Sequence, residues 1–224
     1  MKNNSGFDAN KIASDLLKNL KPIHKLHYTN KPGIYAVGYK GFIAEEFPWE
    51  PVRNKINDNP IIYIGNTQSF SASTYRNEVF ASGKSETATF RRAIGAILQI
   101  KRDLHPIPRS NTEKSDQKYE NYKFLNEHMM TLWMYTSLSL SFWKYEGSLE
   151  KLKNYENQLI QTIVPPLNIK NNPENKFSND LKVLQNICAE LAKANDNWVS
   201  NNILIKNHWI IWIIGKNMSR ITES

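Results

Sequence analysis

The spacing of apolar residues along the 224-residue chain predicts short helices and short strands. Near the N-terminus apolar residues recur at intervals of three and four positions, and Pro22 closes this helical segment. Two apolar runs, at residues 32–39 and 60–65, are typical of strands. The polar stretch between them, residues 40–59, is a long connection, so we expect the two strands to form an antiparallel pair.

Beyond the second strand, helical and extended patterns follow one another. Helical periodicity recurs at about residues 70–81, 85–101, 122–135, 148–163 and 177–194. Residues 106–121 contain prolines and many charges, which predicts a surface loop. Strict polar–apolar alternation over residues 137–142 predicts a half-buried strand, and the apolar run Trp209–Ile214 predicts an additional one. Because helices and antiparallel strands mix without a βαβ repeat, the fold class is α+β, with a small antiparallel sheet of about three central strands flanked by helices.

Composition limits the partners that such a fold can have. The formal net charge is +8 and the sequence pI is near 9.4, which favours a polyanionic partner, either nucleic acid or an anionic membrane surface. The single cysteine, Cys188, allows no disulfide within the chain. No signal peptide or bilayer-spanning apolar run is visible, so we expect a soluble cytoplasmic protein without a membrane partner. His24 and His27 lack the cysteine partners of a typical zinc site.

Two tyrosines in the expected strand pair are the first candidates for chemistry. Side chains alternate across a sheet, so Tyr35 on the first strand and Tyr63 on the second can project from the same face. Gly33 and Gly65 bound the pair, and glycine permits another group to approach the backbone closely. Two phenols with open backbone beside them are suited to facing a phosphate. Packing is the alternative, because tyrosine is a common strand residue.

A carboxylate in the helix expected over 148–163 is the second candidate. Glu156 lies in the middle of an apolar stripe that includes Leu152, Leu159 and Ile160. A charge that faces the core is costly unless it is paired, protonated or bound to a metal ion. Glu156 therefore needs a partner, and the alternatives are a metal ion and an ion pair with an arginine.

Basic residues around the expected helix at 85–101 are candidates for contact with phosphates. Arg92 lies opposite the apolar stripe that Phe90 marks, which favours a solvated charge or a phosphate contact. Arg91 lies at the edge of that stripe, and Lys84 precedes the helix. We expect these three residues, Lys84, Arg91 and Arg92, to form a nucleic-acid-binding surface.

Five elements then stand in an order that resembles the GIY-YIG nuclease family: Gly33-Ile34-Tyr35, Tyr63-Ile64-Gly65, Arg76, Glu156 and Pro165-Pro166-Leu167-Asn168. The first two are similar to the tripeptides that name the family. The next two are similar to its helix arginine and its metal-binding glutamate, and the last to its Pro-Pro-Leu-Asn ending. The resemblance is to the restriction-endonuclease-like branch and covers about residues 30–195. It implies a helical extension at 1–29 and a C-terminal extension at 196–224 that packs on the same core.

The resemblance implies a divalent-metal-dependent endonuclease that hydrolyses DNA phosphodiester bonds, in a restriction-like or related role. Glu156 is then the ligand of Mg²⁺ or Mn²⁺, and Arg76 donates hydrogen bonds to the phosphate. Either Tyr35 or Tyr63 takes the proton of the attacking water. Asn168 ties its loop to the site by hydrogen bonds, or caps the helix. A homodimer on a symmetric DNA site is compatible with this activity.

One position departs from the family's pattern. Phe80 stands four residues after Arg76, where the family often has a histidine. If that histidine assists proton transfer, this chain must manage without it. The alternative functions are therefore a nucleic-acid-binding module that kept the fold and lost hydrolysis, and a basic structural protein whose tyrosines and glutamate belong to the core.

Overall fold

The computed structural model describes residues 7–25, 29–39, 41, 46–47, 60–70, 85, 88–109 and 115–201. Arg76, Phe80 and Lys84 lie outside these residues. The same is true of nearly all of the helix expected over 70–81 and of the strand expected at Trp209–Ile214.

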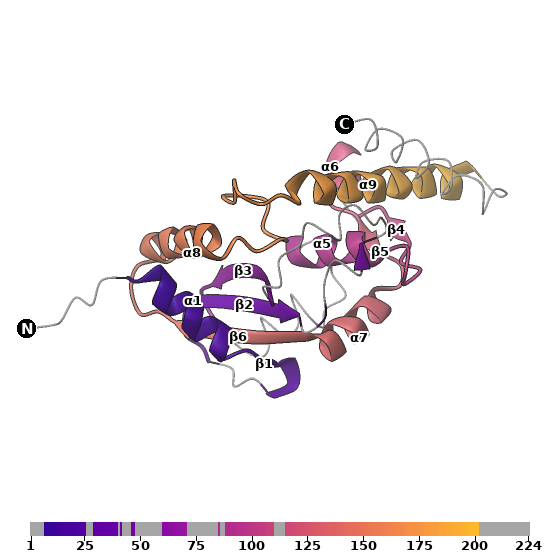
Figure 1. Ribbon diagram of the computed structural model, residues 1–224. Coiled ribbons are helices and arrows are strands. Elements are labelled where there is room, and N and C mark those ends of the chain that lie inside the picture. The colour runs from indigo at the N-terminus through magenta and orange to yellow at the C-terminus, as the bar shows by residue number, and fades with distance from the viewer. Residues whose placement is uncertain are drawn as a thin grey trace, which may run out of the picture.

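Four antiparallel strands form the central sheet in the order β1-β6-β2-β3 (Figure 1). Their bounds are Lys21–Pro22 for β1, Gly33–Tyr39 for β2, Ile61–Thr67 for β3 and Leu138–Lys144 for β6. The predicted pairing of the two apolar runs is confirmed, because β2 and β3 are antiparallel neighbours. With helices around this small sheet, the expected α+β class is confirmed as well.

Strand β6 is more deeply buried than its alternating sequence predicted. It lies between β1 and β2, and its first four residues, Leu138–Ser141, are all buried. Ser139 and Ser141 are among them, although a half-buried strand would turn these hydroxyls to water. A central strand is covered on both faces, so the polar–apolar alternation predicted the strand correctly and its exposure wrongly.

The longer helices of the described residues are α1 (Ala9–Lys18), α5 (Thr89–Leu98), α7 (Glu127–Ser137), α8 (Leu149–Ile163) and α9 (Ser178–Asn201). The helix expected over 148–163 is confirmed, whereas the last helix continues past its expected end at residue 194. None of the helices in the described part of the chain is long and apolar enough to cross a membrane.

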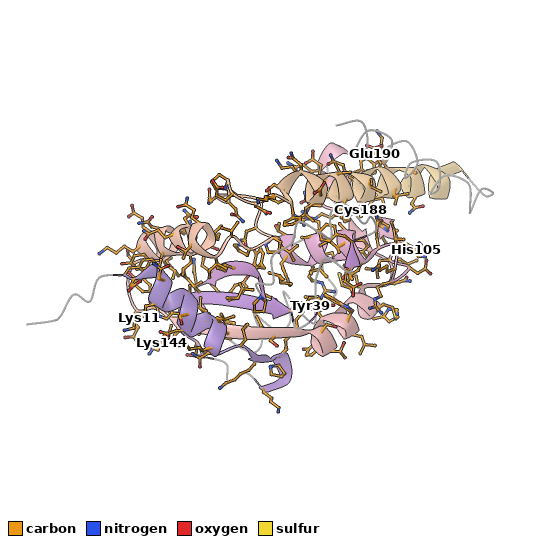
Figure 2. The ribbon with its side chains drawn as sticks, in the orientation of Figure 1. Lys11, Tyr39, His105, Lys144, Cys188 and Glu190 are labelled. Atoms are coloured by element: carbon orange, nitrogen blue, oxygen red, sulfur yellow. The ribbon has the colours of Figure 1, made fainter. Side chains whose placement is uncertain are left out.

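The helices cover the two faces of the sheet with separate apolar clusters. On one face, Ile34 and Ala36 of β2 pack with α1 and α8. On the other face, Val37 belongs to a larger cluster with α5, α7 and α9. Figure 2 shows Cys188 on the side of α9 that faces this cluster and Glu190 on the outer side, in agreement with their buried and exposed classes. Cys188 is thus a small core residue.

The stretch expected as a surface loop at 106–121 contains regular structure. β4 (Pro106–Ile107) pairs antiparallel with β5 (Lys123–Phe124), and α6 (Ser115–Glu120) lies between them in the chain. The Nδ2 group of Asn195 on α9 donates a hydrogen bond of 2.7 Å to the Pro106 carbonyl. Because two-residue strands leave almost no periodic signal, the sequence pattern did not predict this tie between α9 and the connection.

Helix α8 has a well-defined beginning and an unusual end. The Ser148 hydroxyl accepts a hydrogen bond from the Lys151 amide, which is a standard N-terminal cap. At the other end Val164 adopts a left-handed conformation with a φ of 53°, and its amide donates to the Ile160 carbonyl. A β-branched residue rarely takes this conformation, and Pro165 prevents the helix from continuing. The chain therefore turns sharply away from α8 after Ile163.

The structure places Arg91 in the core, contrary to the expectation that it contacts DNA. Its side chain is fully buried, and its Nη2 group lies 2.6 Å from the Glu127 carboxylate and 2.9 Å from the Thr131 hydroxyl. The second carboxylate oxygen of Glu127 accepts a hydrogen bond from the Ser85 amide. Arg91 thus joins α5, α7 and the backbone at Ser85, and its guanidinium is not accessible to a phosphate in this arrangement.

Replacing Glu127 with alanine is expected to lower the free energy of unfolding by about 3–5 kcal/mol, because the substitution leaves a buried guanidinium without its counter-charge. Chemical denaturation of the purified variant measures this. Glu190→Ala, which removes an exposed carboxylate from α9, is the control and should change stability by less than about 0.5 kcal/mol. A Glu127→Ala protein as stable as the control would contradict the structural role of the pair.

Candidate active site

A hollow of about 590 Å³ lies beside β3, the edge strand of the sheet. Tyr63 and Asn66 of β3 line it, and so does Glu156 of α8. The segment that follows α8 closes it on another side, and Thr89 of α5 and Gln185 of α9 complete it. Tyr63, Glu156 and Asn168, all three expected in the active site, therefore line one cavity.

The two tyrosines lie on the same face of the sheet, as their positions predicted. Tyr35 stands opposite Gly65, and Val37 stands opposite Tyr63, so the phenols are diagonal neighbours. Their ring centroids are 6.1 Å apart. Tyr35 is buried, with 7% of its surface exposed, whereas Tyr63 is half-buried and reaches the hollow.

The glycines beside the tyrosines have a different role from the one expected. A Cβ atom at Gly65 would lie 2.4 Å from the Tyr35 hydroxyl, because the Tyr35 ring crosses the β3 backbone there. At Gly33 the corresponding space is filled by Phe142 and the Trp143 carbonyl. The close approach that glycine permits is therefore used by neighbouring residues of the protein, and the backbone beside the tyrosines is not open to a phosphate.

The environment of Tyr63 keeps its phenol protonated at neutral pH. Burial and, to a smaller extent, the Glu156 carboxylate raise the pKa of Tyr63 to about 12, although a hydrogen bond with Tyr35 acts in the opposite direction. In these surroundings Tyr63 thus lacks the lowered pKa that would suit a proton acceptor. A positive charge near Glu156 would offset the effect of that carboxylate on the pKa of Tyr63 and leave the effect of burial.

Glu156 is half-buried on α8 and interacts with an amide of the sheet. Its Oε2 atom accepts a hydrogen bond from the Nδ2 group of Asn66 on β3. Burial raises the pKa of the Glu156 carboxyl, whereas the bonds from Asn66 and the charge of Lys153 lower it. Within the described residues no arginine forms an ion pair with Glu156, and Arg76 lies outside them. Leu152, which belongs to the expected stripe, is buried as predicted.

Asn66 is a site residue that the sequence pattern did not identify. It follows Gly65 directly and, because it stands opposite Ile34, it projects to the face that α8 covers. Its partner Glu156 is 90 positions away in the chain, so no local periodicity could have linked the two. Its position in the sequence could have indicated it, because Asn66 directly follows Tyr63-Ile64-Gly65 and strand alternation places it on the opposite face from Tyr63.

Asn168 fastens the segment after α8 to the free edge of β3. Its Nδ2 group donates to the Ile64 carbonyl and its Oδ1 atom accepts from the Ile64 amide, both at 2.8 Å. The Leu167 amide adds a bond of 3.0 Å to the Ile62 carbonyl. In turn, Asn172 and Asn175 both donate to the Asn168 carbonyl. Asn168 is therefore a positioning residue, tied to the site as expected, and the sequence pattern missed the two asparagines behind it.

Arg92 is half-buried and does not line the hollow. Its Nη1 group donates to the Ser85 carbonyl at 2.9 Å. Burial lowers the pKa of the guanidinium, and the nearby Arg109 lowers it further. A contact between Arg92 and DNA stays a prediction, and Lys84 lies outside the described residues.

The residues around the hollow fit a hard divalent cation better than zinc. Among the described residues there is no group of three histidine, cysteine, aspartate or glutamate side chains that could enclose a metal ion. Zinc sites use such sets, whereas Mg²⁺ commonly binds one or two carboxylates together with waters and substrate phosphates. The half-buried Glu156 carboxylate, with a hydrogen bond from Asn66 at Oε2, meets that requirement.

A carboxylate and a phenol that line one hollow, with a second phenol packed beside the first, form a site suited to metal-assisted hydrolysis and proton transfer. A family model described as the GIY-YIG catalytic domain matches residues 33–187 of the chain. The protein therefore belongs to the GIY-YIG family and is a nuclease by family. Comparison with curated proteins and with solved structures gives no match.

Replacing Asn168 with alanine should lower the free energy of unfolding by about 2–4 kcal/mol, because it removes two buried hydrogen bonds and leaves the Ile64 amide and carbonyl without these partners. Thermal and chemical denaturation measure the loss. Asn186→Ala is the matched control, since Asn186 is an exposed asparagine of α9 that does not line the hollow. Equal stability of the two variants would contradict the positioning role.

Proposed function

We propose that the protein is a divalent-metal-dependent endonuclease that hydrolyses DNA phosphodiester bonds in a restriction-like or related role. The observation that carries this proposal is that Tyr63 and Glu156 line the same hollow, with Tyr35 in contact behind Tyr63, in a chain of a nuclease family. The net charge of +8 supports a polyanionic substrate.

Phosphodiester hydrolysis needs a water in line with the leaving oxygen, an acceptor for its proton, and compensation of the charge on the phosphoryl oxygens. We assign to Tyr63 the role of accepting the proton of the attacking water, because its phenol reaches the hollow whereas that of Tyr35 is buried. Tyr35 holds the Tyr63 hydroxyl from behind by a hydrogen bond. Arg76 is assigned to the phosphoryl oxygens, to which a guanidinium can donate two parallel hydrogen bonds.

Glu156 would hold Mg²⁺ or Mn²⁺, with Asn66 fixing the orientation of its carboxylate. Bound there, the cation would supply Lewis-acid stabilisation of the leaving oxygen. The same positive charge would offset the Glu156 carboxylate, which is one of the two causes that raise the pKa of Tyr63 to about 12. A loaded site would therefore favour loss of the Tyr63 proton to solvent, and the phenolate that remains is the form able to accept the proton of the attacking water.

A second candidate function is a nucleic-acid-binding module that kept the fold without hydrolysis. It is favoured by Phe80, which stands where the family often carries a histidine. Incubating a supercoiled plasmid with the protein, in Mg²⁺ and separately in EDTA, distinguishes the two. Nicking or linearisation that requires Mg²⁺ supports the nuclease, and DNA binding without cleavage in either buffer supports the module.

Glu156→Gln should reduce the rate of plasmid cleavage by about 10²–10³-fold while folding and DNA binding persist. The substitution removes the charge that a cation needs but keeps an oxygen that can accept the Asn66 hydrogen bond. Since the carboxylate is half-buried, its loss should leave thermal stability unchanged or slightly raised.

Glu150→Gln, an exposed carboxylate in the first turn of the same helix, is the control and should cut at the rate of the unsubstituted protein. If Glu156 instead serves a structural ion pair, its replacement should cost about 3–5 kcal/mol of stability. A Glu156→Gln protein that is much less stable, yet cuts normally when folded, would contradict the assignment of the metal ligand.

Tyr63→Phe should lower the cleavage rate by about 10²–10⁴-fold, the usual contribution of a positioned proton acceptor. Tyr35→Phe should lower it less, because Tyr35 acts through its hydrogen bond to Tyr63. Both substitutions keep the ring, so packing against Gly65 and Phe90 is retained and each variant is a control for the other. Single-turnover cleavage assays measure the rates. A larger loss of rate for Tyr35→Phe than for Tyr63→Phe would show that Tyr35 accepts the proton of the attacking water.

A further inference from the structure

We infer that the DNA backbone beside the scissile phosphate is held by a rim of the hollow made of Lys153 and Asn157 on α8 and Lys170 and Asn171 in the segment that follows it. We call these four residues the α8 rim. The inference rests on the proposed function, since it places the substrate of that same site. It assigns phosphate contacts to residues for which the sequence pattern predicted no role.

The four residues form one continuous border of the hollow. All of them line it together with Glu156. The Nδ2 group of Asn171 donates to the Oδ1 atom of Asn157 at 2.7 Å, which joins the segment after α8 to the helix itself. Asn171 has a φ of 59°, a left-handed conformation that asparagine tolerates better than most residues. The turn at this position brings Lys170 and Asn171 to the same border as Lys153.

The two lysine ammonium groups of the α8 rim are accessible to phosphates. Lys153 and Lys170 are exposed, and neither forms an ion pair with any residue that the structure describes. Some lysines of the described part are instead engaged in ion pairs, Lys118 with Asp196 and Lys144 with Glu146. Lys153 lies close enough to Glu156, one helical turn away, for its charge to lower the pKa of that carboxyl. A cationic group therefore stands directly beside the proposed catalytic carboxylate.

The chemistry of the rim matches a nucleic-acid backbone. Each strand of duplex DNA carries a negative charge about every 3.4 Å along the axis, so a phosphate held near Tyr63 and Glu156 has charged neighbours on both sides. Lysine ammonium groups neutralise such phosphates, and asparagine amides donate hydrogen bonds to their oxygens. By contrast, the guanidinium of Arg91 is buried against Glu127, so α5 offers no comparable surface at that position.

The test uses fluorescence anisotropy of the full chain with labelled DNA duplexes of two unrelated sequences, in EDTA so that no cleavage occurs, at several salt concentrations. Lys153→Ala and Lys170→Ala should each flatten the plot of log affinity against log salt by about 1. The double variant should bind both duplexes about tenfold more weakly at low salt. Because these are backbone contacts, the loss should be equal for the two sequences.

Lys193→Ala is the charge-matched control, because Lys193 is exposed on α9 and does not line the hollow. It should keep the affinity and the slope of the unsubstituted protein, and melting temperatures should show that all variants are folded. Unchanged slopes for Lys153→Ala and Lys170→Ala, beside a protein that binds and cuts DNA, would overturn the rim and leave the nuclease proposal standing. An unsubstituted protein that neither binds nor cuts DNA would overturn both.

Discussion

The free edge of β3 is the constraint on which the rest of the site depends. A strand at the edge of a sheet presents backbone amides and carbonyls that need partners. Here Asn168 and Leu167 supply them, with hydrogen bonds to Ile64 and Ile62. Because the same strand carries Tyr63 and Asn66, and the chain reaches Asn168 directly from α8, satisfying this edge also sets the distance between the phenol and Glu156. The hydrogen bonds that complete the sheet edge are thus the same ones that position the site residues.

The position of Glu156 reflects a balance between burial and ionisation. Removal from water raises the pKa of its carboxyl, and the bonds from Asn66 and the charge of Lys153 offset part of that effect. A fully buried carboxylate would have to be neutral or strongly paired, and a fully exposed one would bind a cation weakly against competing water. Half-burial with hydrogen bonds from Asn66 leaves the carboxylate oriented and still able to ionise. The Glu156 charge also raises the pKa of Tyr63, so the ionisation of the two groups is coupled.

The sequence predicted those parts of the structure that local periodicity determines. Alternation in β2 and β3 placed Tyr35 and Tyr63 on one face, and helical spacing in α8 placed Glu156 beside buried leucines. Contacts between distant segments were not predictable in this way. A helical wheel put Arg91 at the edge of its stripe, but it could not show that Glu127, 36 positions later, supplies a buried counter-charge. The Asn66–Glu156 bond and the asparagine pair behind Asn168 were missed for the same reason, because hydrogen-bonding amides leave no periodic trace.

The sharp turn at Val164 has a consequence for how the chain can change over evolutionary time. Glu156 and Asn168 are attached to one rigid path, a helix that ends at Ile163 and a proline-bounded bend that delivers Asn168 to Ile64. One extra residue between Glu156 and Ile163 would rotate Glu156 by about 100° relative to the C-terminal end of the helix, away from Asn66. One extra residue in the bend would instead detach Asn168 from the sheet. The length of the chain between Glu156 and Asn168 is therefore as strictly determined as the identity of these two residues, and insertions should be tolerated before Leu149 or after Asn175 rather than between Glu156 and Asn168.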